Sequence, residues 1–141
     1  MPMPMEYQHA SEAFDRFLRD LIEQSGLATR NQVYTVTQGV FQTFRRRLDI
    51  CDAIRFAGVL PPVLRAIFVA DWNTDEPKRG FADRAVMIAE VKALRRDHNF
   101  ASDTSIEDVA IALRKNMTEA ELDSVLAVLP KEAAEFWRVA Y

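Results

Sequence analysis

Residues 29–48 read TRNQVYTVTQGVFQTFRRRL, and this stretch decides the fold. Thr29 and Gln32 make a T-x-x-Q capping box, a pattern that marks the start of a helix. Behind the box, apolar side chains fall within a stripe of about 140° when each residue turns the helix by about 100°. They are Val33, Val36, Val40, Phe41, Phe44 and Leu48. The stretch therefore predicts a long helix with one buried face, although its β-branched residues alone would favour a strand.

Similar helix signals recur along the rest of the chain. T-x-x-E patterns at 104–107 and 118–121 predict capping boxes, and Asp49 can cap another helix. Gly26 ends a helix as a C′ glycine, and Pro61 opens one. The other apolar stripes span 14–22, 54–56, 64–68, 87–94, 106–113, 122–126 and 136–137. We therefore predict an all-α protein with eight helices.

The helix pattern also repeats within the chain. When Leu60-Pro61 is set over Leu129-Pro130, core, cap and proline positions coincide without a gap. Matched pairs include Val40 with Val109, Phe44 with Leu113, Arg45 with Arg114, Asp49 with Thr118 and Phe68 with Trp137. This agreement favours two similar four-helix units packed as one helical bundle domain. We expect disorder over 1–5 and one domain over 6–141, with halves at about 6–70 and 81–141 joined by a polar linker, 71–80.

The repeated motifs resemble a family of bacterial proteins, the domain of unknown function 2267. The residues that carry the resemblance are Arg47-Leu48, Leu60-Pro61, Leu64-Arg65, Ile67-Phe68, Trp72, Ala110, Leu113, Thr118 to Leu122, Leu129-Pro130 and Phe136-Trp137. The resemblance runs from about Phe14 to Trp137. It implies an all-helical fold and a bacterial, cytosolic setting, and it implies no activity and no catalytic residue.

Composition narrows the class of protein. The net charge is −3 and the sequence pI is near 5.4, whereas a general nucleic-acid binder usually carries a basic surplus. Cys51 is the only cysteine, which excludes an intrachain disulfide and argues against a thiolate-bound zinc. No apolar stretch is long enough to cross a membrane. We expect a soluble, cytoplasmic protein that does not bind a membrane, with no cofactor.

The basic triplet Arg45, Arg46 and Arg47 is the first candidate site. Arg45 and Arg46 are candidates for contact with an anion or a nucleic acid. Consecutive helical residues point about 100° apart, however, so the three side chains should not share a face. Arg47 lies beside the apolar stripe, where we expect it to pair with a carboxylate at the edge of the core. Nucleic-acid binding is therefore the less favoured interpretation.

Asp71, Asn73 and Asp75 match the opening of a calcium-binding EF-hand loop. The pattern then fails, because Glu76 replaces the glycine of position six and Ala82 replaces the glutamate of position twelve. A polar linker rich in turn formers is the favoured interpretation, and we predict no metal site.

Two further residues have chemistry of their own. His98 lies near a predicted helix end and has no metal-ligand spacing to another histidine, so we interpret it as complementing a helix C-terminus. Cys51 lies in a first helical turn between Asp49 and Asp52, whose charges disfavour a thiolate. No catalytic set of residues is recognised, and we expect no enzymatic activity.

Three apolar residues fall outside the stripes: Trp72, Ile111 and Tyr141. Aromatic and apolar groups in such places are typical of interfaces, which makes Trp72 and Ile111 candidates for protein contact. The leading hypothesis is a non-enzymatic interaction or scaffold module that contacts another protein or a second copy of itself. The alternative is a domain that binds a small molecule or a nucleic acid in the cleft between the two halves.

Overall fold

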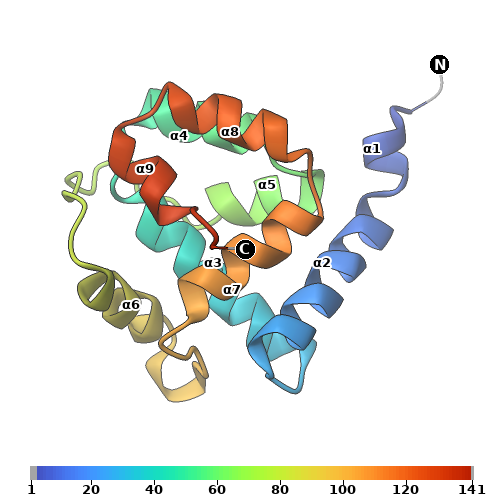
Figure 1. Cartoon of the computed structure of the whole chain (residues 1–141), viewed down its shortest axis with the longest axis horizontal. Helices are drawn as coiled ribbons and strands as arrows, with labels where there is room; N and C mark the ends of the chain where they lie inside the picture. The colour runs from blue at the N-terminus through green and yellow to red at the C-terminus, as the bar shows by residue number, and fades with distance from the viewer. Residues whose placement is uncertain (1–2, 141) are drawn as a thin grey trace.

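The computed structural model describes residues 3–140, and every regular element in this range is a helix (Figure 1). The prediction of an all-α fold is therefore confirmed. The α-helices are α1 (Met5–Gln8), α2 (Ala10–Ser25), α3 (Arg30–Arg45), α4 (Ile50–Val59), α5 (Pro62–Val69), α6 (Arg84–Ala93), α7 (Ser105–Lys115), α8 (Glu119–Ala127) and α9 (Lys131–Phe136). A short 3₁₀ helix, Arg96–His98, follows α6.

The eight predicted helices correspond to α2 through α9. Helix α1 was not predicted, and it begins at Met5 within the segment expected to be disordered. Residues 1 and 2 lie outside the described residues, so the expectation of disorder there stays a prediction. Tyr141 also lies outside the described residues.

Helix α3 forms as its sequence predicts and runs through the middle of the molecule (Figure 1). The capping box is present: the Gln32 amide N–H donates to Thr29 Oγ1 at 3.2 Å, and the Thr29 N–H donates to Gln32 Oε1 at 3.1 Å. The whole apolar stripe is buried, which is why a helix and not a strand is stable here.

The other predicted caps have mixed outcomes. Gly26 is confirmed, because it is left-handed (φ 75°) and its N–H donates to Ile22 O. The side-chain caps at Asp49, Thr104 and Thr118 are wrong, since no side-chain cap hydrogen bond forms at any of them. Other side chains compete for two of these residues. Asp49 pairs with a lysine of the linker, and the Thr104 hydroxyl donates to the Asp108 carboxylate at 2.9 Å.

One hydrophobic core draws on both halves of the sequence. At its centre the ring of Phe44 lies 4.9 Å from that of Phe136 and 5.3 Å from that of Trp137. The ring of Phe56 stacks on Trp137 at 5.5 Å. These aromatic contacts join α3 and α4 to the C-terminal segment, and stacked or edge-to-face aromatic pairs add about 0.5–1.5 kcal/mol each beyond area burial.

Helix pairs from opposite halves pack together throughout the fold. Helix α2 packs on α7, α3 packs on α6, and α4 lies beside α8 (Figure 1). The approach of α6 to α3 is close enough to require a glycine, because a Cβ at Gly39 would lie 2.9 Å from Val91 O. Within residues 3–140, no helix has the length and apolar character needed to cross a membrane.

Candidate functional site

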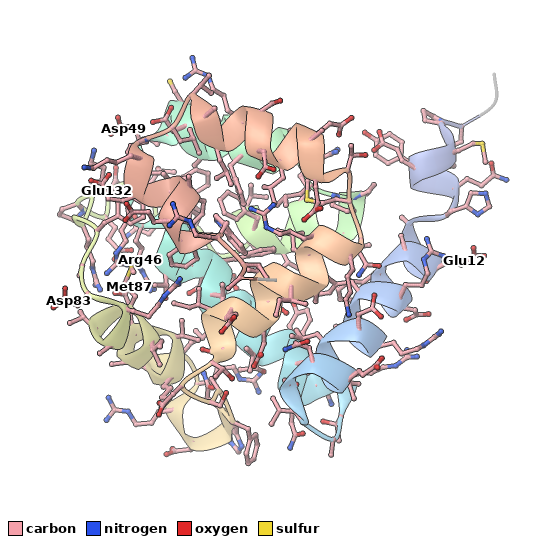
Figure 2. All side chains as sticks on the ribbon, in the orientation of Figure 1. Glu12, Arg46, Asp49, Asp83, Met87 and Glu132 are labelled. Carbon is pink, nitrogen blue, oxygen red and sulfur yellow. The ribbon has the colours of Figure 1, made fainter. Side chains whose placement is uncertain are left out.

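The linker between the halves folds back on the corner where α3 meets α4. The Arg79 amide N–H donates to Arg46 O at 2.9 Å, and the Lys78 Nζ lies 3.1 Å from the Asp49 carboxylate. Arg46 Nε lies 3.4 Å from Glu76 Oε1. Figure 2 shows Arg46 and Asp49 on the side of the molecule away from Glu12 of α2. These contacts hold the linker against the helices over its second half.

The folded linker and the corner enclose a cavity of about 320 Å³, which we name the linker cavity. The corner contributes Arg45, Arg46, Leu48, Asp49, Ile50 and Cys51, and the linker contributes Trp72, Asn73, Thr74, Glu76, Pro77 and Lys78. Residues singled out separately in the sequence therefore meet at one place. The cavity lies beside the first half and the linker, not in a cleft between the halves.

Arg45 is the most deeply buried charged residue of this cavity, with 4% of its surface exposed. Its Nη1 donates to Phe68 O at 2.8 Å and to Ala70 O at 3.0 Å, so it satisfies carbonyls at the C-terminus of α5. Its guanidinium lies over the Trp72 ring at 5.1 Å from the centroid. Within residues 3–140, Arg45 forms no ion pair with a carboxylate, and its buried Nε donates to no acceptor.

Burial is the main reason why the pKa of Arg45 lies below its ordinary value, and the neighbouring charge of Arg46 lowers it further. The carboxylates of Glu76 and Asp71 act in the opposite direction. The direction of this shift shows that the environment of the guanidinium disfavours its charge. An anion brought into the cavity would relieve that cost.

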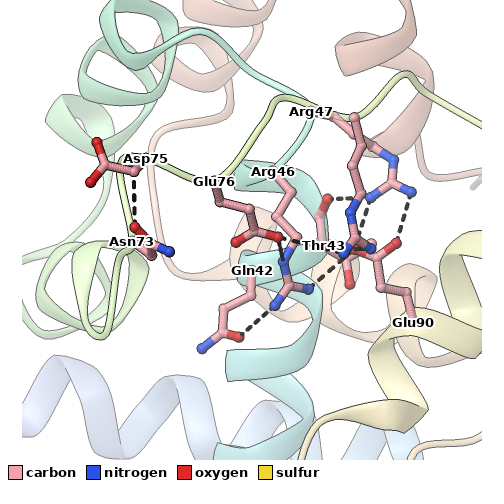
Figure 3. Close-up of polar contacts among 9 residues, drawn as sticks. Gln42, Thr43, Arg46, Arg47, Asn73, Asp75, Glu76 and Glu90 are labelled. Atoms are coloured by element: carbon pink, nitrogen blue, oxygen red, sulfur yellow. Dashed lines mark hydrogen bonds and ion pairs between the residues drawn. The ribbon is translucent and has the colours of Figure 1, made fainter.

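A second group of charges surrounds Glu90 of α6 (Figure 3). Arg47 donates to both Glu90 oxygens, at 2.8 and 3.2 Å, and Arg46 donates to Oε1 at 3.1 Å. Arg79 Nη1 lies 3.3 Å from the same Oε1. The prediction that Arg47 pairs with a carboxylate is confirmed. Arg46 and Arg47 thus share one carboxylate at the C-terminal end of α3.

Burial alone would raise the pKa of Glu90. Hydrogen bonds from Arg47 and Arg46 and the charges of Arg47 and Arg79 outweigh it, so the pKa of Glu90 lies below its ordinary value. The carboxylate is thus held ionised at neutral pH. It serves to hold three arginines in place, and its hydrogen bonds leave it poorly suited to accept a proton from a substrate.

Trp72 is half-buried, and the turn before it explains its position. Asp71 has a φ of 54°, a left-handed conformation that aspartate tolerates better than most residues. The chain reverses there after α5, which places the indole under Arg45. Trp72 therefore forms a wall of the cavity as well as an edge of the core.

The linker residues that match the opening of a calcium-binding loop form a turn. The Asp75 N–H donates to Asn73 Oδ1 at 3.1 Å, which is an Asx turn. Within the described residues, no group of three or more His, Cys, Asp or Glu side chains is placed to hold a metal ion. Cys51 is exposed at the mouth of the cavity, in the first turn of α4.

The remaining candidates lie elsewhere. Ile111 is half-buried on α7, and His98 is exposed in the 3₁₀ helix. The contact predictions for Trp72, Ile111, Arg45 and Arg46 stay predictions. Sequence reasoning missed Glu76, Lys78 and Glu90 as members of the site. The polar composition of the linker was a signal for the first two, whereas Glu90 is one of many carboxylates on helix surfaces.

Comparison with known proteins places the chain in a family. No curated protein matches it. The family model described as "Uncharacterized conserved protein (DUF2267)" matches residues 14–136, which includes the linker cavity and both halves of the core. The chain therefore belongs to the DUF2267 family of uncharacterized conserved proteins.

Proposed function

We propose that this chain is a non-enzymatic helical binding module and that the linker cavity is its binding site. One observation carries the proposal: Arg45, a buried guanidinium without a carboxylate partner among residues 3–140, lies in the wall of a cavity beside an aromatic ring. Ligand sites in proteins usually have volumes of roughly 300–1,000 Å³ with a few polar groups in an apolar wall. At about 320 Å³, the linker cavity is at the small end of this range.

A protein partner is the second candidate, and the outer face of α4 favours it. Ile50, which lines the cavity, and Ile54 lie one helical turn apart on α4 and are 48% and 59% exposed. A partner that covers them would bury apolar surface at the same place. Nucleic acid is disfavoured, because Arg46 is already held by Glu76 and Glu90.

The repeat of two four-helix units belongs to the same proposal, as does their packing as one domain. Helices α4 and α8 begin at Ile50 and Glu119. Helices α5 and α9 begin at Pro62 and Lys131, which are separated by the same distance along the chain. The contact of α2 with α7 has a counterpart in the contact of α6 with α3. Both facts support a doubled fold. A bacterial, cytoplasmic setting belongs to the proposal only because the family resemblance implies it.

The test blocks the linker cavity with a bulky label on Cys51, the only cysteine of the chain. The tagged protein is labelled at Cys51 with a bulky maleimide, and partners are recovered from native lysate with and without nuclease. Mass spectrometry then identifies bound proteins and small molecules. The matched control carries Cys51→Ala and Ser11→Cys and is labelled at position 11, which is exposed on α2.

We expect the unlabelled protein to recover a bound component with or without nuclease. The labelled control should recover the same component, and the protein labelled at Cys51 should not. Capture that is equal with and without the Cys51 label would contradict the cavity as the site. Recovery of nucleic acid, lost on nuclease treatment, would overturn the proposal and favour Arg45 and Arg46 as nucleic-acid contacts.

A further inference from the structure

The second half of the chain contains a guanidinium in the same setting as Arg45. In the alignment of the two halves, Arg114 matches Arg45 and Trp137 matches Phe68. Arg45 donates to the carbonyl of Phe68 at 2.8 Å, and Arg114 donates to the carbonyl of Trp137 at 3.0 Å. Each arginine thus extends from the end of a long helix to the carbonyl at the end of a short one.

The two arginines differ in their counter-charges. Arg114 Nη1 lies 3.5 Å from Glu119 and 3.1 Å from Asp123, both on α8. In the same alignment, the positions that match these carboxylates on α4 are Ile50 and Ile54. Arg114 is therefore neutralised within the chain, whereas Arg45 has two exposed isoleucines where its carboxylates would be.

The charges of the linker cavity leave one positive charge for a ligand. Among the lining residues, Arg45, Arg46 and Lys78 are cationic and two carboxylates are anionic. Arg46 is paired with Glu76 and Glu90, and Lys78 is paired with Asp49. The unbalanced charge is that of Arg45, which matches a monoanion better than a dianion such as phosphate.

The uncharged part of the lining indicates what the anion carries. Leu48, Ile50, Trp72 and Pro77 line the cavity beside Arg45. An apolar group attached to the anion would cover this surface, and a strongly hydrated inorganic ion would leave it exposed. Carboxylate is the anion that the matching arginine already uses in the second half.

We propose that the linker cavity binds a monocarboxylate with a short apolar group, its carboxylate on Arg45 and its apolar group against Ile50 and Trp72. This inference rests on the proposed function and names the class of ligand. The carboxylate of the ligand gives Arg45 a negative partner, as Glu119 and Asp123 of the same chain do for Arg114. A charge-assisted hydrogen bond from a guanidinium is well suited to this task because the fork geometry of arginine fits a carboxylate.

The test is a titration of the purified chain with hexanoate, followed by amide chemical shifts and by calorimetry. Hexanamide is the uncharged control ligand, and inorganic phosphate is the hydrated anion. A peptide that ends in a free leucine carboxylate, compared with its C-terminal amide, distinguishes a free acid from a chain terminus as the source of the carboxylate. We expect hexanoate or this peptide to bind, with shifts at the cavity, and their amides to bind at least tenfold more weakly.

The decisive variant is the double substitution Ile50→Glu and Ile54→Asp, which gives Arg45 the carboxylates that Arg114 has. Both positions are exposed, so the fold tolerates the change, and unfolding curves verify this. We expect the Kd of the carboxylate ligand to rise about tenfold or more, since one charge-assisted hydrogen bond is replaced. Phe100→Glu adds a negative charge at an exposed site outside the cavity and should leave the Kd unchanged.

Three results would overturn the inference: no binding of either carboxylate ligand, equal binding by the double variant, or tighter binding of phosphate. The outcome is separable from that of the proposed function. If the Cys51 label removes a lysate component but neither carboxylate binds, the cavity is a binding site and only this ligand class is wrong.

Discussion

Replacing Glu90 by glutamine should destabilise the chain strongly, because it removes the charge that three arginines share. The Arg47 side chain is 3% exposed and that of Glu90 is 12% exposed, so this pair is screened little by water. Breaking a buried ion pair from one side costs about 3–5 kcal/mol, since the remaining charge stays buried. Glutamine keeps the shape and one acceptor oxygen. We therefore expect the free energy of unfolding to fall by about 3 kcal/mol at pH 7, the lower end of that range.

The dependence of this loss on pH follows from the lowered pKa of Glu90. A carboxyl whose pKa is lower in the folded than in the unfolded state stabilises the fold above the unfolded value, about 4.3. That contribution is lost as the pH falls through the folded value. The difference in unfolding free energy between wild type and Glu90→Gln should therefore be full at pH 7 and shrink below about pH 4.

The measurement is urea unfolding followed by circular dichroism, in steps from pH 7 to about pH 3. For a chain of this size the change corresponds to a fall in Tm of about 6–12 °C at pH 7. Glu23→Gln is the matched control, because Glu23 is exposed on α2 and forms no ion pair within the described residues. A loss below about 1 kcal/mol, or one that is equal at pH 7 and at low pH, would refute the reasoning.

Further predictions concern the core and the helix ends. Gly39→Ala should destabilise the chain by about 1–3 kcal/mol in urea unfolding, because the new methyl group would press on Val91 O; a stabilised variant would show that α6 can shift. Gly26→Ala should cost about 1 kcal/mol, since Gly26 is left-handed with open space around it; an unchanged Tm would contradict this. Burial is the main reason that the pKa of Asp108 is raised. Asp108→Asn should therefore stabilise the fold at pH 7 by up to about 1 kcal/mol, and this gain should vanish at low pH. A loss of stability at pH 7 would mean that the hydrogen bonds of Asp108 to Thr104 and Gln24 dominate.

Parts of the site could be predicted because they depend on local chemistry. The position of Arg47 beside the apolar stripe of α3 was enough to predict that it needs a carboxylate at the edge of the core. The identity of that carboxylate was not predictable. Glu90 lies far away in the sequence, on a helix whose path depends on the linker and on the packing of α6 against Gly39.

The incorrect cap predictions at Thr104 and Asp49 have different origins. A T-x-x-E pattern predicts a capping box only if the first residue is extended, so that its hydroxyl faces the free N–H groups of the helix. Thr104 instead has φ −101° and ψ 10°, and its hydroxyl bonds Asp108. Asp49 is extended as required, but its carboxylate pairs with Lys78 of the linker. A tertiary ion pair replaces the cap hydrogen bond at Asp49, whereas a local side-chain hydrogen bond to α7 itself replaces it at Thr104.

The sequence by itself determined helices α2 to α9 and most of their buried faces, although it missed α1 and placed Ile54, which is exposed, in an apolar stripe. Helical hydrogen bonds join residues four apart and apolar stripes recur every 3.6 residues, so both are encoded within a single turn or two. Only the tertiary structure decided that Arg45, Cys51 and Trp72 line one cavity. It also decided that Arg45 lacks the carboxylates that Arg114 has. The physical reason is that burial, and therefore the cost of an unpaired charge, depends on how distant segments pack, and no local period records that packing.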